Sequence, residues 1–225
     1  EFPIYSVQFS ADDSGFYFGT GFSSDPEWNG AGITELYYYD IATAKATKVD
    51  LDWELGIGGG YTVAGNDVIV SLANKATMKL AYYTKKGTSW SRSEMDFEDK
   101  NEHVSLNAIA DDASKIVYTY STASKLPQYF VADLKKNKVS NEKIFTALNK
   151  KLEKKYMPKS EIITWTGYNG DEVTGILYYP NNYQEGKKYP LMLNIHGGPS
   201  SQDTDEWSGS WAYYPSILVQ KNMFV

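Results

Sequence analysis

The first 145 residues alternate between short apolar, aromatic-rich runs and polar turn clusters. Such alternation predicts β-strands that have one buried and one exposed face, joined by turns. We expect twelve strands, at residues 5–10, 16–18, 35–41, 46–51, 60–63, 66–72, 80–84, 90–95, 105–110, 116–120, 128–134 and 139–145. The pattern therefore predicts an all-β region.

These predicted strands fall into a repeat. The run Ala110-Asp111-Asp112-Ala113-Ser114 resembles Ala11-Asp12-Asp13-Ser14, and Val131-Ala132-Asp133-Leu134 resembles Tyr38-Tyr39-Asp40-Ile41. Four short strands at a spacing of about 40–50 residues are typical of one blade of a β-propeller. The region therefore predicts three blades, which would leave open edges because a closed propeller needs roughly four to eight.

The pattern changes after residue 145. Phe145, Leu148, Leu152 and Tyr156 have the spacing of an amphipathic helix, with lysines between them and Pro158 at its end. We therefore expect a linker helix within residues 146–160.

A mixed sheet is predicted after this linker. Two apolar runs, at residues 161–165 and 173–179, flank Asn169-Gly170 and predict a hairpin. The run Leu191–Ile195 is apolar throughout, which favours a strand buried on both faces. Residues 214–220 favour a helix that ends at Asn222, and residues 224–225 would open the next strand.

The stretch that points most directly to chemistry is Tyr189–Pro199, where the predicted strand ends abruptly in His196-Gly197-Gly198-Pro199. Strand ends of this kind in α/β-hydrolases lead into a loop whose backbone N–H groups stabilise the oxyanion of acyl transfer. Glycine suits such a loop because a side chain would hold the reacting carbonyl away from the main chain. The motif therefore predicts serine hydrolysis.

Blades, linker, hairpin and glycine turn together resemble the prolyl oligopeptidase family of serine peptidases, in its acylaminoacyl peptidase and dipeptidyl peptidase branch. The residues that carry this resemblance are Ile162–Pro180 and Lys188–Pro199. It implies a mixed fold class: β-propeller blades over residues 1–145, a linker over 146–160, and the N-terminal part of an α/β-hydrolase fold over 161–225. It also implies hydrolysis of short peptides through an acyl-enzyme, with the propeller as a size filter over the hydrolase.

The resemblance implies a role for each residue of the turn. The backbone N–H of Gly198 corresponds to the family's oxyanion donor in this loop, while His196, Gly197 and Pro199 would shape the turn. The catalytic serine, aspartate and histidine would all follow the loop in chain order. No Gly-x-Ser-x-Gly motif occurs in this sequence. We therefore expect a segment of a longer peptidase that is inactive alone.

An acidic cluster follows the turn. Asp203, Asp205 and Glu206 would attract the free amino terminus of a peptide substrate, with Trp207 or Trp211 as a wall of the cleft. An exposed acidic loop explains the carboxylates equally well, and core packing explains the tryptophans. Both interpretations stay open at this stage.

Composition narrows the partners. The net charge of −6 argues against nucleic acid, and no apolar run approaches the roughly 18–20 residues that span a membrane. No cofactor or metal is expected. No spacing of histidines and carboxylates suggests a metal site. The run Gly56–Gly60 resembles a phosphate-binding loop, but such a loop precedes a helix, and strands are predicted after this run. The expected partners are a peptide substrate and the rest of the polypeptide or a complementary chain; an oligomer is allowed.

Two other functions remain open. A propeller-type module that binds a peptide or glycan without chemistry would account for the 19 tyrosines, 9 phenylalanines and 6 tryptophans. An esterase with an unusual N-terminal domain would also use the glycine turn. The chain has no cysteine, so the redox compartment stays open. The resemblance favours an exported, periplasmic bacterial enzyme.

Overall fold

The computed structural model describes residues 3–25, 27, 32–155, 157–198, 201–209 and 215–225 of the 225-residue chain. It divides into two compact units. The first consists of Glu1–Asn74, Met78–Thr119 and Tyr129–Phe145, and the second consists of Lys75–Thr77, Tyr120–Gln128 and Thr146–Val225. The domain boundaries expected from the sequence remain predictions.

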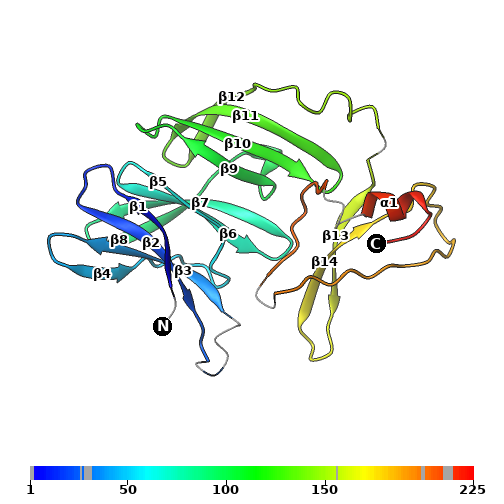
Figure 1. The fold of residues 1–225 in the computed structure, drawn as a ribbon, viewed down its shortest axis with the longest axis horizontal. Coiled ribbons are helices and arrows are strands. Elements are labelled where there is room, and N and C mark those ends of the chain that lie inside the picture. The colour runs from blue at the N-terminus through cyan, green and yellow to red at the C-terminus, as the bar shows by residue number, and fades with distance from the viewer. Residues whose placement is uncertain (1–2, 26, 28–31, 156, 199–200, 210–214) are drawn as a thin grey trace. The chain divides into compact units, whose positions relative to one another are not determined.

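Three four-stranded antiparallel sheets make up most of the first unit (Figure 1). Within each sheet the strands lie in sequence order, as in a propeller blade. The sheets are β1 (Ile4–Phe9), β2 (Gly15–Phe22), β3 (Ile33–Asp40), β4 (Lys45–Lys48); β5 (Ile57–Ala64), β6 (Asp67–Asn74), β7 (Thr77–Lys86), β8 (Ser89–Glu94); and β9 (Val104–Ile109), β10 (Lys115–Thr122), β11 (Lys125–Lys135), β12 (Lys138–Ile144). The twelve strands and the three blades predicted from the sequence are confirmed, and the run Gly58–Gly60 lies within β5.

The first and third sheets each contain a turn of the same geometry. In the β1–β2 turn, Asp12 Oδ1 accepts hydrogen bonds from the N–H and the hydroxyl of Ser14, at 3.1 and 2.7 Å. In the β9–β10 turn, Asp112 Oδ1 accepts the same two bonds from Ser114, at 3.0 and 2.6 Å. The intervening residue has a φ of +55° in both turns. The sequence repeat is therefore a repeat of backbone geometry.

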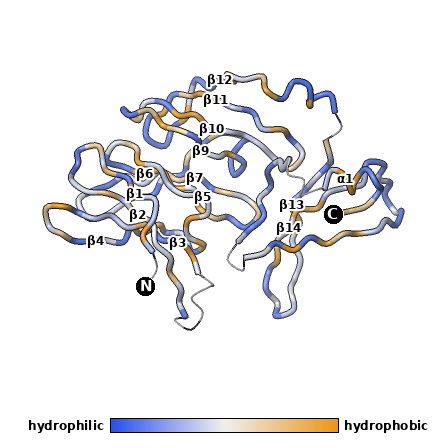
Figure 2. Tube along the Cα trace, viewed as in Figure 1, coloured by the Kyte–Doolittle hydropathy of each residue, from blue (hydrophilic) through white to orange (hydrophobic). Residues whose placement is uncertain are grey.

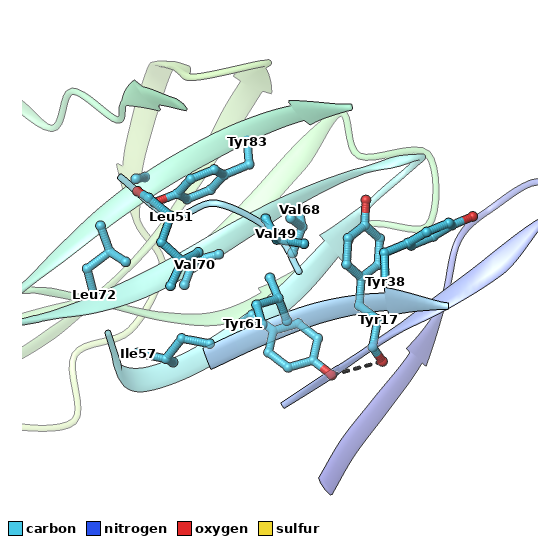
Figure 3. Close-up of a cluster of buried hydrophobic side chains, with 12 residues drawn as sticks. Tyr17, Tyr38, Val49, Leu51, Ile57, Tyr61, Val68, Val70, Leu72 and Tyr83 are labelled. Carbon is cyan, nitrogen blue, oxygen red and sulfur yellow. Dashed lines mark hydrogen bonds between the residues drawn. The ribbon is translucent and has the colours of Figure 1, made fainter. Parts of the chain in front are cut away.

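Buried tyrosines and aliphatic residues join the first two sheets (Figure 3). Tyr17 and Tyr38 of the first sheet pack at a ring distance of 4.9 Å, in the same cluster as Val68, Val70 and Tyr83 of the second. The hydroxyl groups are also satisfied: Tyr61 donates to the Tyr17 carbonyl at 3.1 Å, and Tyr83 donates to the Leu51 carbonyl at 2.7 Å. These tyrosines are therefore core residues of the first unit.

A smaller aromatic cluster forms at the third sheet. Phe97 follows β8 and precedes the 3-10 turn Glu98–Lys100. Its ring lies edge-on to Tyr118 at 5.0 Å, and Tyr118 stacks on Phe130 at 5.0 Å. All three side chains are buried. Contacts of this kind hold successive blades together by apolar burial.

The linker helix predicted within residues 146–160 is wrong. Residues 148–155 form a series of turns, in a mostly hydrophilic stretch (Figure 2). The apolar residues of the predicted helix face are exposed: Phe145 to 54%, Leu148 to 75% and Leu152 to 40%. A short amphipathic helix draws most of its stability from packing its apolar face, and here that face is uncovered.

The second unit contains the hairpin of β13 (Ser160–Thr166) and β14 (Glu172–Tyr178), which was predicted. The strands pair without a break from Ser160–Tyr178 to Thr166–Glu172. Helix α1 (Pro215–Gln220) was also predicted and buries Val219. The turn after the helix closes at Asn222, whose φ is +58°. The Asn222 N–H donates to the Val219 carbonyl, and the Met223 N–H donates to the Leu218 carbonyl.

The described residues contain neither a membrane-spanning helix nor a cluster of metal-ligating side chains. Their only α-helix, α1, is far too short to cross a bilayer. No group of three or more His, Cys, Asp or Glu side chains in the described ranges has the geometry of a metal site.

Candidate functional site

The candidate site is built on a small mixed pairing in the second unit. Tyr178, at the end of β14, and Val225 exchange two backbone hydrogen bonds of 2.8 and 3.2 Å, an antiparallel arrangement. Phe224 forms a parallel bridge with Leu191, through N–H bonds from Phe224 to Pro190 and from Met192 to Phe224 of 2.9 Å each. The spatial order is therefore β13, β14, residues 224–225, residues 190–192.

An aromatic cluster fixes this pairing. The ring of Phe224 lies 5.3 Å from Tyr179, 5.6 Å from Tyr183 and 5.8 Å from Tyr189. The hydroxyl of Tyr189 donates to the Asn182 carbonyl at 2.9 Å and accepts the Gln184 N–H at 3.0 Å. The cluster could not be predicted from the local sequence, because it depends on Phe224, which lies 35–45 residues further along the chain.

The predicted buried strand at Leu191–Ile195 is wrong in the structure. Leu191 makes a single bridge, and the residues after it are not assigned to a strand. Leu191, Leu193 and Ile195 are exposed to 64, 68 and 78%. A wholly apolar run is typical of a strand that is covered on both faces, and in the described residues no layer covers this run.

The glycine turn follows directly. Nδ1 of His196 lies 3.0 Å from the Gly197 carbonyl oxygen. Gly198 has a φ of +154°, which residues with a side chain rarely adopt. No hydrogen bond from the Gly197 or Gly198 amide to a described residue is found. Pro199 lies outside the described residues, and the roles of His196, Gly197, Gly198 and Pro199 remain predictions.

The segment Gln202–Trp207 contacts two turns of the second unit. The Asp205 N–H donates to the Ala76 carbonyl at 2.7 Å, and Asp205 Oδ1 accepts the Ala123 N–H at 2.9 Å. The Trp207 N–H donates to the Ser121 hydroxyl at 3.0 Å. These bonds tie the segment to the β6–β7 turn, to the β10–β11 turn and to the end of β10.

The acidic cluster is not uniform. Glu206 is exposed, whereas Asp203, Asp205 and Trp207 are partly buried. Burial, with smaller contributions from Asp205 and Asp203, raises the pKa of Tyr178 to about 12. A substrate contact at Asp203, Asp205, Glu206 or Trp207 remains a prediction, and Trp211 lies outside the described residues.

One cavity of about 190 Å³ is found in the first unit. This is smaller than the roughly 300–1,000 Å³ typical of small-molecule sites. Both apolar and charged side chains line it: Met78, Lys79, Leu80, Glu94, Met95, Phe97, Asn101, Glu102 and Val104. We therefore do not assign a ligand to it.

No family model matches the chain. Over 193 residues, 83% of the chain, it is 25% identical to the probable dipeptidyl-peptidase 5 of Aspergillus niger. Over 67 residues, 29% of the chain, it is 40% identical to the dipeptidyl-peptidase 5 of Aspergillus oryzae. The chain is related to the prolyl oligopeptidase family of peptidases.

Structural similarity extends over nearly all of the chain. The acylaminoacyl peptidase of Pyrococcus horikoshii, a solved structure, superposes on 98% of the chain with a TM-score of 0.69 and 15% sequence identity. Identity this low supports the fold alone. The chain spans 31% of that structure, 26% of the A. niger protein and 9% of the A. oryzae protein. These three proteins are thus much longer than this chain.

Proposed function

We propose that the chain is a segment of a serine peptidase that hydrolyses short peptides through an acyl-enzyme. Residues 1–145 supply propeller blades that restrict substrate size, residues 146–160 connect the domains, and residues 161–225 begin an α/β-hydrolase domain. Gly198 supplies a backbone donor to the oxyanion. The catalytic serine, aspartate and histidine lie outside this segment, so the segment alone is inactive.

The observation that carries this proposal is the mixed pairing in the second unit. An antiparallel hairpin at the edge of an otherwise parallel sheet is common in large α/β folds. Here the hairpin strand β14 is antiparallel to residues 224–225, which in turn are parallel to residues 190–192. Ligands of open α/β sheets bind beyond the carboxyl ends of the parallel strands. The His196-Gly197-Gly198 turn lies on the carboxyl side of such a segment.

The geometry of Gly198 suits an oxyanion donor. During acyl transfer the serine oxygen attacks the scissile carbonyl, and negative charge develops on the carbonyl oxygen as its double bond breaks. A backbone N–H without a partner in the described residues can donate a hydrogen bond to this oxygen without giving up another bond. Removing one such donor costs a factor of about 10²–10³ in kcat in enzymes of this kind.

The non-catalytic binding module is less well supported. Its main argument was the wealth of aromatic residues, yet Tyr17, Tyr38, Tyr83 and Tyr118 are buried in the core. Buried rings cannot stack on a peptide or a glycan. The esterase alternative differs from the proposed peptidase in its substrate, so assays with ester and peptide substrates distinguish the two.

The proposal is tested by extending the protein downstream in its reading frame. We expect the next residues, about a hundred, to contain a Gly-x-Ser-x-Gly motif, and the extended protein to react with a fluorophosphonate probe. In that protein Gly198→Ala slows labelling about tenfold or more, because a residue with a Cβ is strained at a φ of +154°. Gel fluorescence of the labelled protein measures the rate.

The matched control is Gly186→Ala. Gly186 also has a positive φ, +79°, and a Cβ there would meet open space. The substitution likewise places a Cβ on a residue of positive φ, but away from the turn, and labelling should change less than about twofold. Absence of labelling in the extended protein would refute the peptidase. Rapid cleavage of ester substrates with no cleavage of peptide amides would instead favour the esterase.

A further inference from the structure

We infer that Asp205 is a positioning residue: it anchors the segment after the glycine turn to two β-turns and so holds the proposed oxyanion loop in place. This inference rests on the proposed function for its catalytic consequence. The anchor itself is defined by Asp205, Ala76 and Ala123, and its bonds lie within the second unit.

Asp205 bonds to both turns at once. Its backbone N–H reaches the β6–β7 turn at Ala76, and its carboxylate reaches the β10–β11 turn at Ala123. Its neighbours add to these bonds: Gln202 Nε2 donates to the Thr77 carbonyl at 3.3 Å, and the Trp207 N–H donates to Ser121. A six-residue segment is thus held against the two turns by side chains and backbone together.

The anchor is buried where it matters. Ala76 is exposed to only 5%, Ala123 to 3% and Ser121 to 7%. The Ala123 N–H therefore has little access to water, and the Asp205 carboxylate satisfies it with a charge-assisted bond. A buried N–H that loses its partner is costly, whereas a surface N–H would bond to water. Asp205 is therefore more than an ordinary surface acid.

The anchor is close enough to restrain the turn. Gln202 lies four residues after Gly198, so the chain between them spans at most about 14 Å even when fully extended. Fixing Gln202–Trp207 therefore limits where the Gly198 amide can lie. Positional errors of about 1 Å at a reacting centre are enough to reduce rates by about 10²-fold.

Two substitutions separate an anchor from a substrate contact. Asp205→Ala removes the acceptor for the Ala123 N–H, while Asp205→Asn keeps an oxygen acceptor and removes the charge. Hydrogen exchange in this 225-residue chain should be about tenfold faster at the Ala123 amide in the alanine variant and near wild type in the asparagine variant. Glu185→Ala, which removes an exposed carboxylate, serves as the control and should leave exchange at the Ala123 amide unchanged.

The same variants in the extended protein test the catalytic consequence. For an anchor, Asp205→Ala lowers kcat about tenfold with little change in KM, and Asp205→Asn restores kcat to within about threefold. Two results would overturn the inference. The first is unchanged hydrogen exchange at the Ala123 amide in Asp205→Ala. The second is an equal loss of activity in both variants that appears as a higher KM, and only for substrates with a free amino terminus. If exchange behaves as expected but the extended protein never reacts with a fluorophosphonate, the proposed peptidase fails and the anchor remains purely structural.

Discussion

Asp12 and Asp112 each organise a tight turn by accepting two hydrogen bonds from a serine two residues later. The hydrogen bonds from Ser14 and Ser10 lower the pKa of Asp12 from its ordinary value to about 2. The hydrogen bonds from Ser114 likewise lower the pKa of Asp112. In both turns the ionised carboxylate is the form that the folded protein favours.

This turn gives the fold a pH dependence. Because the folded pKa of Asp12 is lowered, its stabilisation is complete above about pH 4 and is lost as the pH falls towards 2. Asp12→Ala should lower Tm by about 2–4 °C at pH 7, equivalent to about 1 kcal/mol. The difference from wild type should shrink between pH 4 and pH 2. Thermal melts followed by circular dichroism measure it, and a difference independent of pH would contradict the assignment.

The contacts of some residues could be predicted from the sequence and those of others could not. The Asp-Ser turns were visible because each carboxylate and its serine lie two residues apart. The anchoring contact of Asp205 was not, since its partner Ala123 is 82 residues away and has no side-chain polarity. In the sequence Asp205 is one of three neighbouring acids, with Asp203 and Glu206. Only the fold separates them.

At the scale of elements, the strands were the most predictable part. The alternation of aromatic and polar residues has a period of two, and the pleat of a sheet imposes the same period. Elements whose pattern needs a covering layer were not predictable. The linker helix and the strand at Leu191–Ile195 both present apolar residues that are exposed in the structure.

The second sheet should bear most of the stability of the first unit. Leu72 on β6 is completely buried, so Leu72→Ala should lower the free energy of unfolding by about 2–5 kcal/mol. Ile144→Ala on β12 removes a side chain that is 54% exposed and should cost much less, under about 1 kcal/mol. Urea denaturation of both variants gives the comparison. Equal losses of unfolding free energy in the two variants would mean that the buried cluster around Leu72 is not the centre of the core.

At the scale of the whole molecule, the proposed function predicts that the apolar run Leu191–Ile195 is covered in the complete enzyme. Exposed apolar patches bind hydrophobic dyes and promote association. We therefore expect the 225-residue chain to enhance the fluorescence of anilinonaphthalene sulfonate. Paired Leu193→Ser and Ile195→Ser substitutions should reduce this signal, as should the downstream extension. The same enhancement in the extended protein would show that the run stays uncovered.

The family resemblance was predictable because two linked motifs, Ile162–Pro180 and Lys188–Pro199, carry it in local sequence. The relatives and the fold support it. The chemistry was less accessible. An oxyanion donor is a backbone amide, which every residue except proline has, so only its position in a fold distinguishes it.

The position of Phe224 and Val225 has a consequence for biosynthesis. These two residues lie between β14 and residues 190–192, both of which leave the ribosome earlier. The pairing that joins β14 to residues 190–192 can therefore form only after residue 225 has left the ribosome. Translation pauses just before that point would prolong the time for which the sheet is incomplete, whereas pauses after it would give residues 224–225 time to pair.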